Sequence, residues 1–361
     1  MLNNSHSDNI YEKLREHLDR LPVGFSKTES RVEIDILKKI FKPEEAEMAI
    51  HLQPEPETIE DFCQRTGISM KRAEGMLEKM AKKGQIFRIR REGKVNYSAA
   101  VYLPGIWEYQ LNKLDEELSE LTEKYYYEAL GKDITKGRIP IFRVLPVDEL
   151  LSKETKIMPY DSVKEIVRSQ KTIALADCIC KKERRLTGYA CKHIDNACIL
   201  FSQMATYYVE NGLGKFATVD EALDALDRAE KDGLVHSPQN SKHPMFICNC
   251  CGCCCVSLRR ISQLNLPASQ VVQSEYYCIC DEELCTGCEV CLDRCHVNAN
   301  YLQDDVVKIN REQCIGCGLC VSVCPEDALQ LIRKSDEELS ELPTSVGSIL
   351  REWSVERGLN R

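Results

Sequence analysis

Eight cysteines near the C-terminal end of the chain lie in two runs with the same spacing. Both runs follow the pattern C-x2-C-x2-C-x3-C, and Pro325 comes directly after the second. The first run is Cys285, Cys288, Cys291 and Cys295, and the second is Cys314, Cys317, Cys320 and Cys324. Two residues between cysteines let a tight loop aim three thiolates at three corners of one iron–sulfur cubane, while the fourth cysteine is carried to the other cluster. Two zinc ribbons would leave the third and fourth cysteines of each run without a role.

The spacing therefore predicts two 4Fe-4S clusters with interleaved ligands. One cluster takes Cys285, Cys288, Cys291 and Cys324, and the other takes Cys314, Cys317, Cys320 and Cys295. This module, about residues 275–333, resembles the bacterial two-cluster 4Fe-4S ferredoxins, and the resemblance implies a ferredoxin-like fold. One departure is His296, which follows Cys295 where these ferredoxins have proline, so the chain direction after that ligand is less fixed.

A second set of ten cysteines lies in the middle of the chain, too many to be explained by packing. They are Cys178, Cys180, Cys191, Cys198, Cys248, Cys250, Cys251, Cys253, Cys254 and Cys255. We expect at least one further iron–sulfur cluster here, with structural zinc and redox-active thiols as alternatives. The candidate ligands of a first central cluster are Cys178, Cys180, Cys191 and Cys198. The candidates for a second are Cys248, Cys250, Cys251, Cys253 and Cys254.

Three further side chains near these motifs leave alternatives open. Cys278 and Cys280 precede the first ferredoxin run and are either additional ligands or free thiols. His193 follows Cys191 closely and is either a metal ligand or, as we expect, an ordinary surface histidine.

Composition and charge indicate the class of protein and the compartment in which these cysteines occur. The chain has 361 residues, 21 cysteines, 29% charged residues and a net charge of -9, which argues against the whole chain being a nucleic-acid binder. The first residues carry no basic and apolar export signal, and nowhere do about 18 apolar residues run together. We therefore expect a cytoplasmic protein without a membrane span, in which the cysteines bind metal rather than form disulfides.

The elements expected before the cysteines resemble a winged helix-turn-helix domain over residues 28–103. Three helices, with Thr58 capping the second and Gly67 ending it, precede a hairpin whose apolar residues alternate from Phe87 to Tyr97. From Lys71 to Lys94 there are nine basic and three acidic residues, a net charge of +6. Such a surface is typical of a DNA-reading helix and wing, but also of a solvated face that docks an acidic partner, which we favour.

The whole chain is thus predicted to be an α+β multidomain protein. A helical linker, residues 104–137, follows the winged-helix-like domain, and its apolar spacing from Leu111 to Tyr125 is typical of a short coiled coil or a packing helix, so a homodimer is possible. Next come a cysteine-rich α/β domain at 138–270, with a capping box at Thr218 and Glu221, the ferredoxin module at 275–333 and a helical tail at 334–361.

This layout is similar to large iron–sulfur proteins of strict anaerobes, which implies electron transfer. The leading hypothesis is an electron-transfer protein or subunit that passes low-potential electrons to or from a larger oxidoreductase, its redox partner. The second is a redox-sensing winged-helix transcription regulator, in which DNA is possible but not favoured. The third is a catalytic subunit, because the Cys250-Cys251-Gly252 element resembles the cysteine-rich modules of heterodisulfide reductases, although those carry the element twice.

Overall fold

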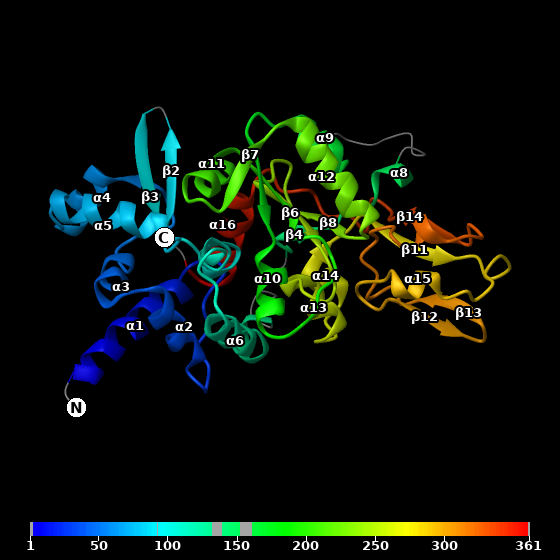
Figure 1. Ribbon diagram of the computed structural model, residues 1–361, viewed down its shortest axis with the longest axis horizontal. Helices are drawn as coiled ribbons and strands as arrows, with labels where there is room; N and C mark the ends of the chain where they lie inside the picture. Colours follow the sequence, from blue (N-terminus) through cyan, green and yellow to red (C-terminus); the bar gives the residue numbers. More distant parts are fainter. Residues whose placement is uncertain (1–2, 92, 132–138, 152–160, 360–361) are drawn as a thin grey trace.

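The computed structural model describes residues 3–91, 93–131, 139–151 and 161–359. Figure 1 shows the N-terminal helices at one end of the long axis, a sheet with helices in the middle, and the C-terminal strands at the other end. The largest buried apolar cluster extends from Tyr11 to Trp353, so the core is continuous across much of the chain.

The N-terminal part combines five helices with a small antiparallel sheet. The helices are α1 (Asn3–Asp19), α2 (Val32–Ile40), α3 (Pro43–Ala49), α4 (Ile59–Thr66) and α5 (Met70–Lys82). The sheet has the order β1 (Glu57–Thr58), β3 (Lys94–Ser98), β2 (Phe87–Arg91). The Thr58 side chain accepts a hydrogen bond from the Asp61 N–H, and Gly67 adopts φ +72° at the end of α4, so both predicted helix signals are confirmed.

Two of these helices were not predicted. In α1, the buried Tyr11, Leu14 and Leu18 lie at helical spacing. In α3, Pro43 occupies the first turn, where its missing N–H costs nothing.

The linker does not form one continuous helix. Irregular turns over Tyr102–Ile106 and Glu108–Gln110 are followed by α6 (Glu116–Tyr125), which begins where Asp115 accepts a hydrogen bond from the Leu118 N–H, and by a further turn at Tyr126–Leu130. Helix α6 packs against α2. The prediction of a packing helix is therefore confirmed over α6, and Leu111 and Leu114 lie before it begins.

The central part is built on a five-stranded sheet with the order β7-β5-β6-β9-β8. Its strands are β5 (Ile173–Asp177), β6 (Asn196–Phe201), β7 (Gly214–Ala217), β8 (Val235–Pro238) and β9 (Phe246–Cys250). Every neighbouring pair is antiparallel. The predicted α/β class is therefore wrong for this region, which is α+β, because its helical connections join antiparallel strands and not the parallel strands of an α/β fold.

Helices cover the central sheet. The apolar faces of α9 (Val163–Arg168) and α12 (Val219–Lys231) pack on side chains of β5, β6 and β9, including the buried Ile199. Thr218 and Glu221 form the predicted capping box at the start of α12. Helix α11 (Ser202–Glu210) contacts β5, β7 and, from the N-terminal part, β2. Further helices among the described residues are α8 (Asp148–Leu151), α10 (Ile179–Leu186), α13 (Val256–Ser262) and α14 (Ala268–Val271). Strand β4 (Phe142–Arg143) pairs with β10 (Val272–Gln273).

The C-terminal part contains two antiparallel strand pairs and a returning helix. β11 (Tyr276–Cys280) pairs with β14 (Leu329–Arg333), and β12 (Asn300–Gln303) pairs with β13 (Val306–Ile309). The short helix α15 (Val290–Asp293) and a turn at Val321–Val323 lie between them in sequence. The last helix, α16 (Val346–Glu356), returns to the middle of the molecule, where the Trp353 Nε1–H donates to the Ile139 carbonyl oxygen at 3.0 Å.

Candidate metal centres

A cavity in the C-terminal part is lined by cysteines from both runs. It opens to solvent, and its cysteines are Cys285, Cys288, Cys291 and Cys324. Apolar side chains, among them Val290, Val307 and Leu329, complete the lining. The tight loop of the first run brings three of these thiols together, and the turn after Cys320 carries Cys324 to them. The four side chains predicted to hold one cubane thus surround one space.

The other four cysteines of the two runs also lie close together. Burial raises the pKa of Cys317, and the neighbouring Cys320, Cys295 and Cys314 add to this effect. Backbone N–H groups point at two of these sulfurs, because Ala299 donates to Cys295 Sγ at 3.2 Å and Cys278 donates to Cys314 Sγ at 3.4 Å. Such bonds stabilise thiolates bonded to a metal.

Two glycines are required where the cysteine loops lie close to the backbone of neighbouring segments. Gly287 adopts φ +66°, and a Cβ on it would lie 2.4 Å from the Asp305 carbonyl oxygen. Gly316 adopts φ +61°, and a Cβ there would lie 2.2 Å from the Tyr276 carbonyl oxygen. The first cysteine loop is therefore held tightly against the turn between β12 and β13, and the second against β11.

Cys278 and Cys280 lie on β11. Cys278 lies beside the set that contains Cys320, and Cys280 lies beside the set that contains Cys285. Cys278 Sγ lies 3.6 Å from Cys320 Sγ. Burial raises the pKa of Cys280 to about 12, and a hydrogen bond to Cys285 adds to the rise. Both thiols are therefore close neighbours of predicted ligands. Cys278 and Cys280 share one face of β11, because alternate side chains of a strand point to the same side.

The central cysteines fall into two groups, and the division differs from the two sets expected from sequence order. The six-cysteine group contains Cys178, Cys180, Cys198, Cys248, Cys250 and Cys255. Cys198 and Cys248 face each other across β6 and β9, and Cys178 directly precedes α10. Hydrogen bonding to Cys198, together with burial, raises the pKa of Cys248. Cys255 was not among the expected ligands, although hydrogen bonding to Cys250 places it in this group.

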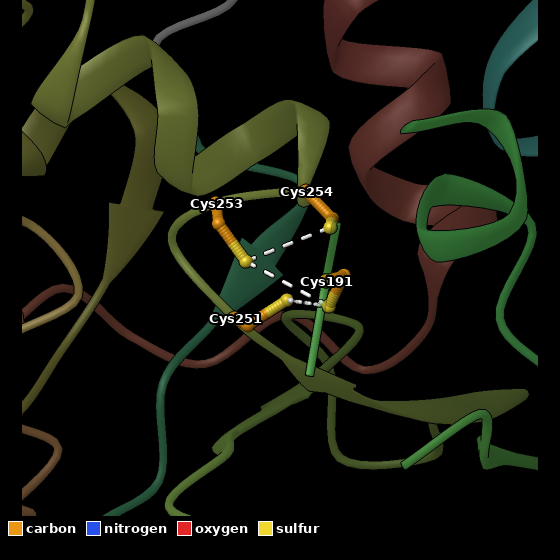
Figure 2. A group of neighbouring side chains, drawn as sticks. All are labelled: Cys191, Cys251, Cys253 and Cys254. Atoms are coloured by element: carbon orange, nitrogen blue, oxygen red, sulfur yellow. Dashed lines mark hydrogen bonds between the residues drawn. The ribbon is translucent and has the colours of Figure 1, made fainter. Parts of the chain in front are cut away.

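The four-cysteine group contains Cys191, Cys251, Cys253 and Cys254, whose sulfurs all lie within 4.8 Å of one another. Figure 2 shows the four side chains converging from two segments. Cys191 lies between α10 and β6, and the other three lie in the turn between β9 and α13. Thus Cys191 lies with three cysteines of the 248–255 segment, whereas it was expected with Cys178, Cys180 and Cys198.

The surroundings of the four-cysteine group include charged and polar side chains. Hydrogen bonds from Cys251 and Cys254 lower the pKa of Cys253, which favours its thiolate. His193 Nδ1 lies 3.1 Å from Asp232 Oδ2, and its ring lies 5.6 Å from that of His296. His193 is therefore held by a carboxylate and is not part of the four-cysteine group.

Comparison with protein families matches part of the ferredoxin module. The 4Fe-4S binding domain family matches residues 307–330, which include the whole second run, Cys314 to Cys324. No curated protein matches the chain. Within the described residues, no helix is both long enough and apolar enough to cross a membrane. The match supports a ferredoxin-like module with an iron–sulfur cofactor, and the four-cysteine group could hold a metal ion.

Proposed function

We propose that the protein is an electron carrier that uses two 4Fe-4S clusters in residues 275–333. The observation that carries this proposal is the cavity lined by Cys285, Cys288 and Cys291 of the first run and Cys324 of the second. This is the interleaved ligand set of a two-cluster ferredoxin. The second cubane is held by Cys314, Cys317, Cys320 and Cys295.

The cluster at the cavity is placed to exchange electrons with a partner protein. Cys288 is exposed, so a cubane held by it lies near the surface. Ten acidic and four basic residues lie between Cys278 and Arg333, a net charge of -6 before cluster charge is counted. Exposed acids near the two loops include Glu282, Glu289 and Asp305. A redox partner with a basic docking surface fits this face, because opposite charges steer encounter.

The six-cysteine group is the place we propose for a further iron–sulfur cluster. Hydrogen bonding to Cys178 and burial raise the pKa of Cys180, and hydrogen bonding to Cys250 and burial raise that of Cys255. Buried thiols with raised pKa values lose their protons when a metal takes the proton's place. Six such side chains offer more than the four thiolates that one cluster needs.

Anaerobic purification followed by iron analysis, sulfide analysis and an electron paramagnetic resonance spectrum tests the carrier function. About eight irons and eight sulfides belong to the two cubanes, and the further cluster adds to both counts. After reduction, the spectrum is expected to contain signals of reduced 4Fe-4S clusters that interact magnetically. A preparation that contains zinc but no sulfide would contradict the proposal.

The regulator remains the second candidate, because the N-terminal arrangement favours a winged-helix fold. Helices α4 and α5 are followed by the β2–β3 hairpin, and β1 completes the small sheet. The ion pairs of the basic hairpin favour packing of the hairpin against the central part over DNA binding. Arg88 and Arg90 of β2 pair with Glu210 of α11, and the Tyr207 hydroxyl lies within hydrogen-bonding distance of the Ala81 and Ile86 carbonyls.

A further inference from the structure

The sulfurs of the four-cysteine group lie close to one another. Cys191 Sγ lies 3.9 Å from Cys251 Sγ and 3.8 Å from Cys253 Sγ. Cys253 Sγ lies 3.6 Å from Cys254 Sγ, and all four atoms lie within 4.8 Å of one another (Figure 2). Four sulfurs this close together can occupy the corners of a tetrahedron around one ion.

The size of this tetrahedron distinguishes between kinds of metal centre. A metal ion with four thiolates at about 2.3 Å places neighbouring sulfurs about 3.8 Å apart, because a tetrahedron's edge is about 1.6 times its centre-to-corner distance. In a cubane, each thiolate is bonded to a different iron, and the irons themselves lie at separate corners. The thiolates of a cubane are therefore much farther apart than those around one ion.

The ferredoxin loops provide an internal comparison. Among the described residues, the sets predicted to hold cubanes do not gather their sulfurs within 4.8 Å, whereas the four-cysteine group does. Cys285, Cys288, Cys291 and Cys324 instead surround a cavity that opens to solvent. One chain thus contains widely spaced thiol sets and one compact set.

We propose that Cys191, Cys251, Cys253 and Cys254 bind a single metal ion, zinc or iron, in tetrahedral thiolate coordination. Cys251 and Cys254 are almost fully buried, at 1% exposure each, so the ion is shielded from water on one side. The ion fixes the turn between β9 and α13 to the loop that carries Cys191. It is a centre separate from the clusters of the proposed function.

This ion sits where the central part meets the ferredoxin module. Gly252, between two of the ligands, packs against the backbone of His296, and His296 directly follows the predicted cubane ligand Cys295. His296 Nε2 also lies 2.6 Å from the Gly233 carbonyl oxygen. Holding this turn rigid therefore also holds the loop that supplies a thiolate to the second cubane.

Metal and sulfide stoichiometry of the anaerobically purified full chain tests this proposal. In 4Fe-4S clusters iron and sulfide are equal in number, so a mononuclear site adds either one zinc or one iron without sulfide. For zinc, X-ray absorption should give four sulfurs at about 2.3 Å and no neighbouring metal. Equal iron and sulfide with no zinc would overturn the single-ion site. An absence of sulfide would instead overturn the carrier function, so the two failures differ.

The Cys253→Ser variant assigns the ion to its ligands. It should lose about one metal ion per chain while sulfide stays unchanged, because only the mononuclear site is damaged. Cys63→Ser is the matched control, since Cys63 lies on α4, far from the other cysteines in sequence. Loss of several irons together with as many sulfides would overturn the proposal. If the variant does not fold, the wild-type stoichiometry still decides.

Discussion

Gly252 and His296 lie so close together that no side chain fits between them. A Cβ on Gly252 would lie 2.0 Å from the His296 carbonyl oxygen, and backbone atoms cannot easily move aside. The turn that carries three thiols of the four-cysteine group therefore depends on glycine to meet the ferredoxin module. His296, which replaces the proline of related motifs, belongs to the same contact through its bond to Gly233.

Gly252→Ala should lower the free energy of unfolding by about 1–3 kcal/mol, because overpacking forces the two backbone segments apart. Thermal or denaturant unfolding measures the change. Gly75→Ala is the matched control, since a Cβ on Gly75 in α5 meets nothing within 4 Å. This control should gain roughly 0.5–1 kcal/mol from helix propensity. Equal effects of the two substitutions would contradict the close contact.

Cys317→Ser should remove about four of the irons, because a serine hydroxyl is a poor ligand for the cubane held by the second run. Cys63→Ser should leave the iron content unchanged, since Cys63 is a packing residue of α4. Iron and sulfide analysis of both variants provides the measurement. Similar iron losses in the two proteins would refute the ligand assignment.

DNA binding by residues 28–103 should be weak and lost as salt rises. Six of the nine basic residues from Lys71 to Lys94 already have acidic partners: Arg72, Lys79, Lys82, Lys83, Arg88 and Arg90. A gel shift with genomic fragments at low and physiological salt tests this. Tight, sequence-specific retention that changes with cluster oxidation would favour the regulator instead.

Arg88→Ala should cost about 2 kcal/mol, because it removes the buried guanidinium that pairs with both Glu78 and Glu210. The Arg88 side chain is only 1% exposed and joins β2 to α11. Lys94→Ala, on the exposed start of β3, is the control and should change stability by less than about 0.5 kcal/mol. Denaturant unfolding compares them, and equal stabilities would show that Arg88 does not hold the two parts together.

Local signals in the sequence predicted local structure well. The Thr58 cap, the box of Thr218 with Glu221 and the hairpin from Phe87 to Tyr97 each depend on residues a few positions apart. The spacing within each ferredoxin run is local in the same sense, so a cavity lined by three thiols of one run follows from it. Short-range geometry leaves few alternatives for such segments.

Long-range pairing could not be derived in the same way. Cys191 meets Cys251 across 60 positions of sequence, and nothing in their spacing selects this partner over Cys178 or Cys198. The pairing of β6 with β9 places Cys198 opposite Cys248, and so assigns both to the six-cysteine group. Arg88 was likewise expected on a charged surface, and it is buried because α11 covers β2.

The contact between the end of α16 and α1 can form only late in translation of this sequence. Arg357, just after α16, donates to the Asp19 carbonyl oxygen at the end of α1, 338 residues earlier. At roughly 5–20 residues per second, a ribosome needs tens of seconds to cover that interval. All twenty-one cysteines have been translated before Arg357. Helix α1 therefore gains this contact only after every cysteine in this sequence has been translated.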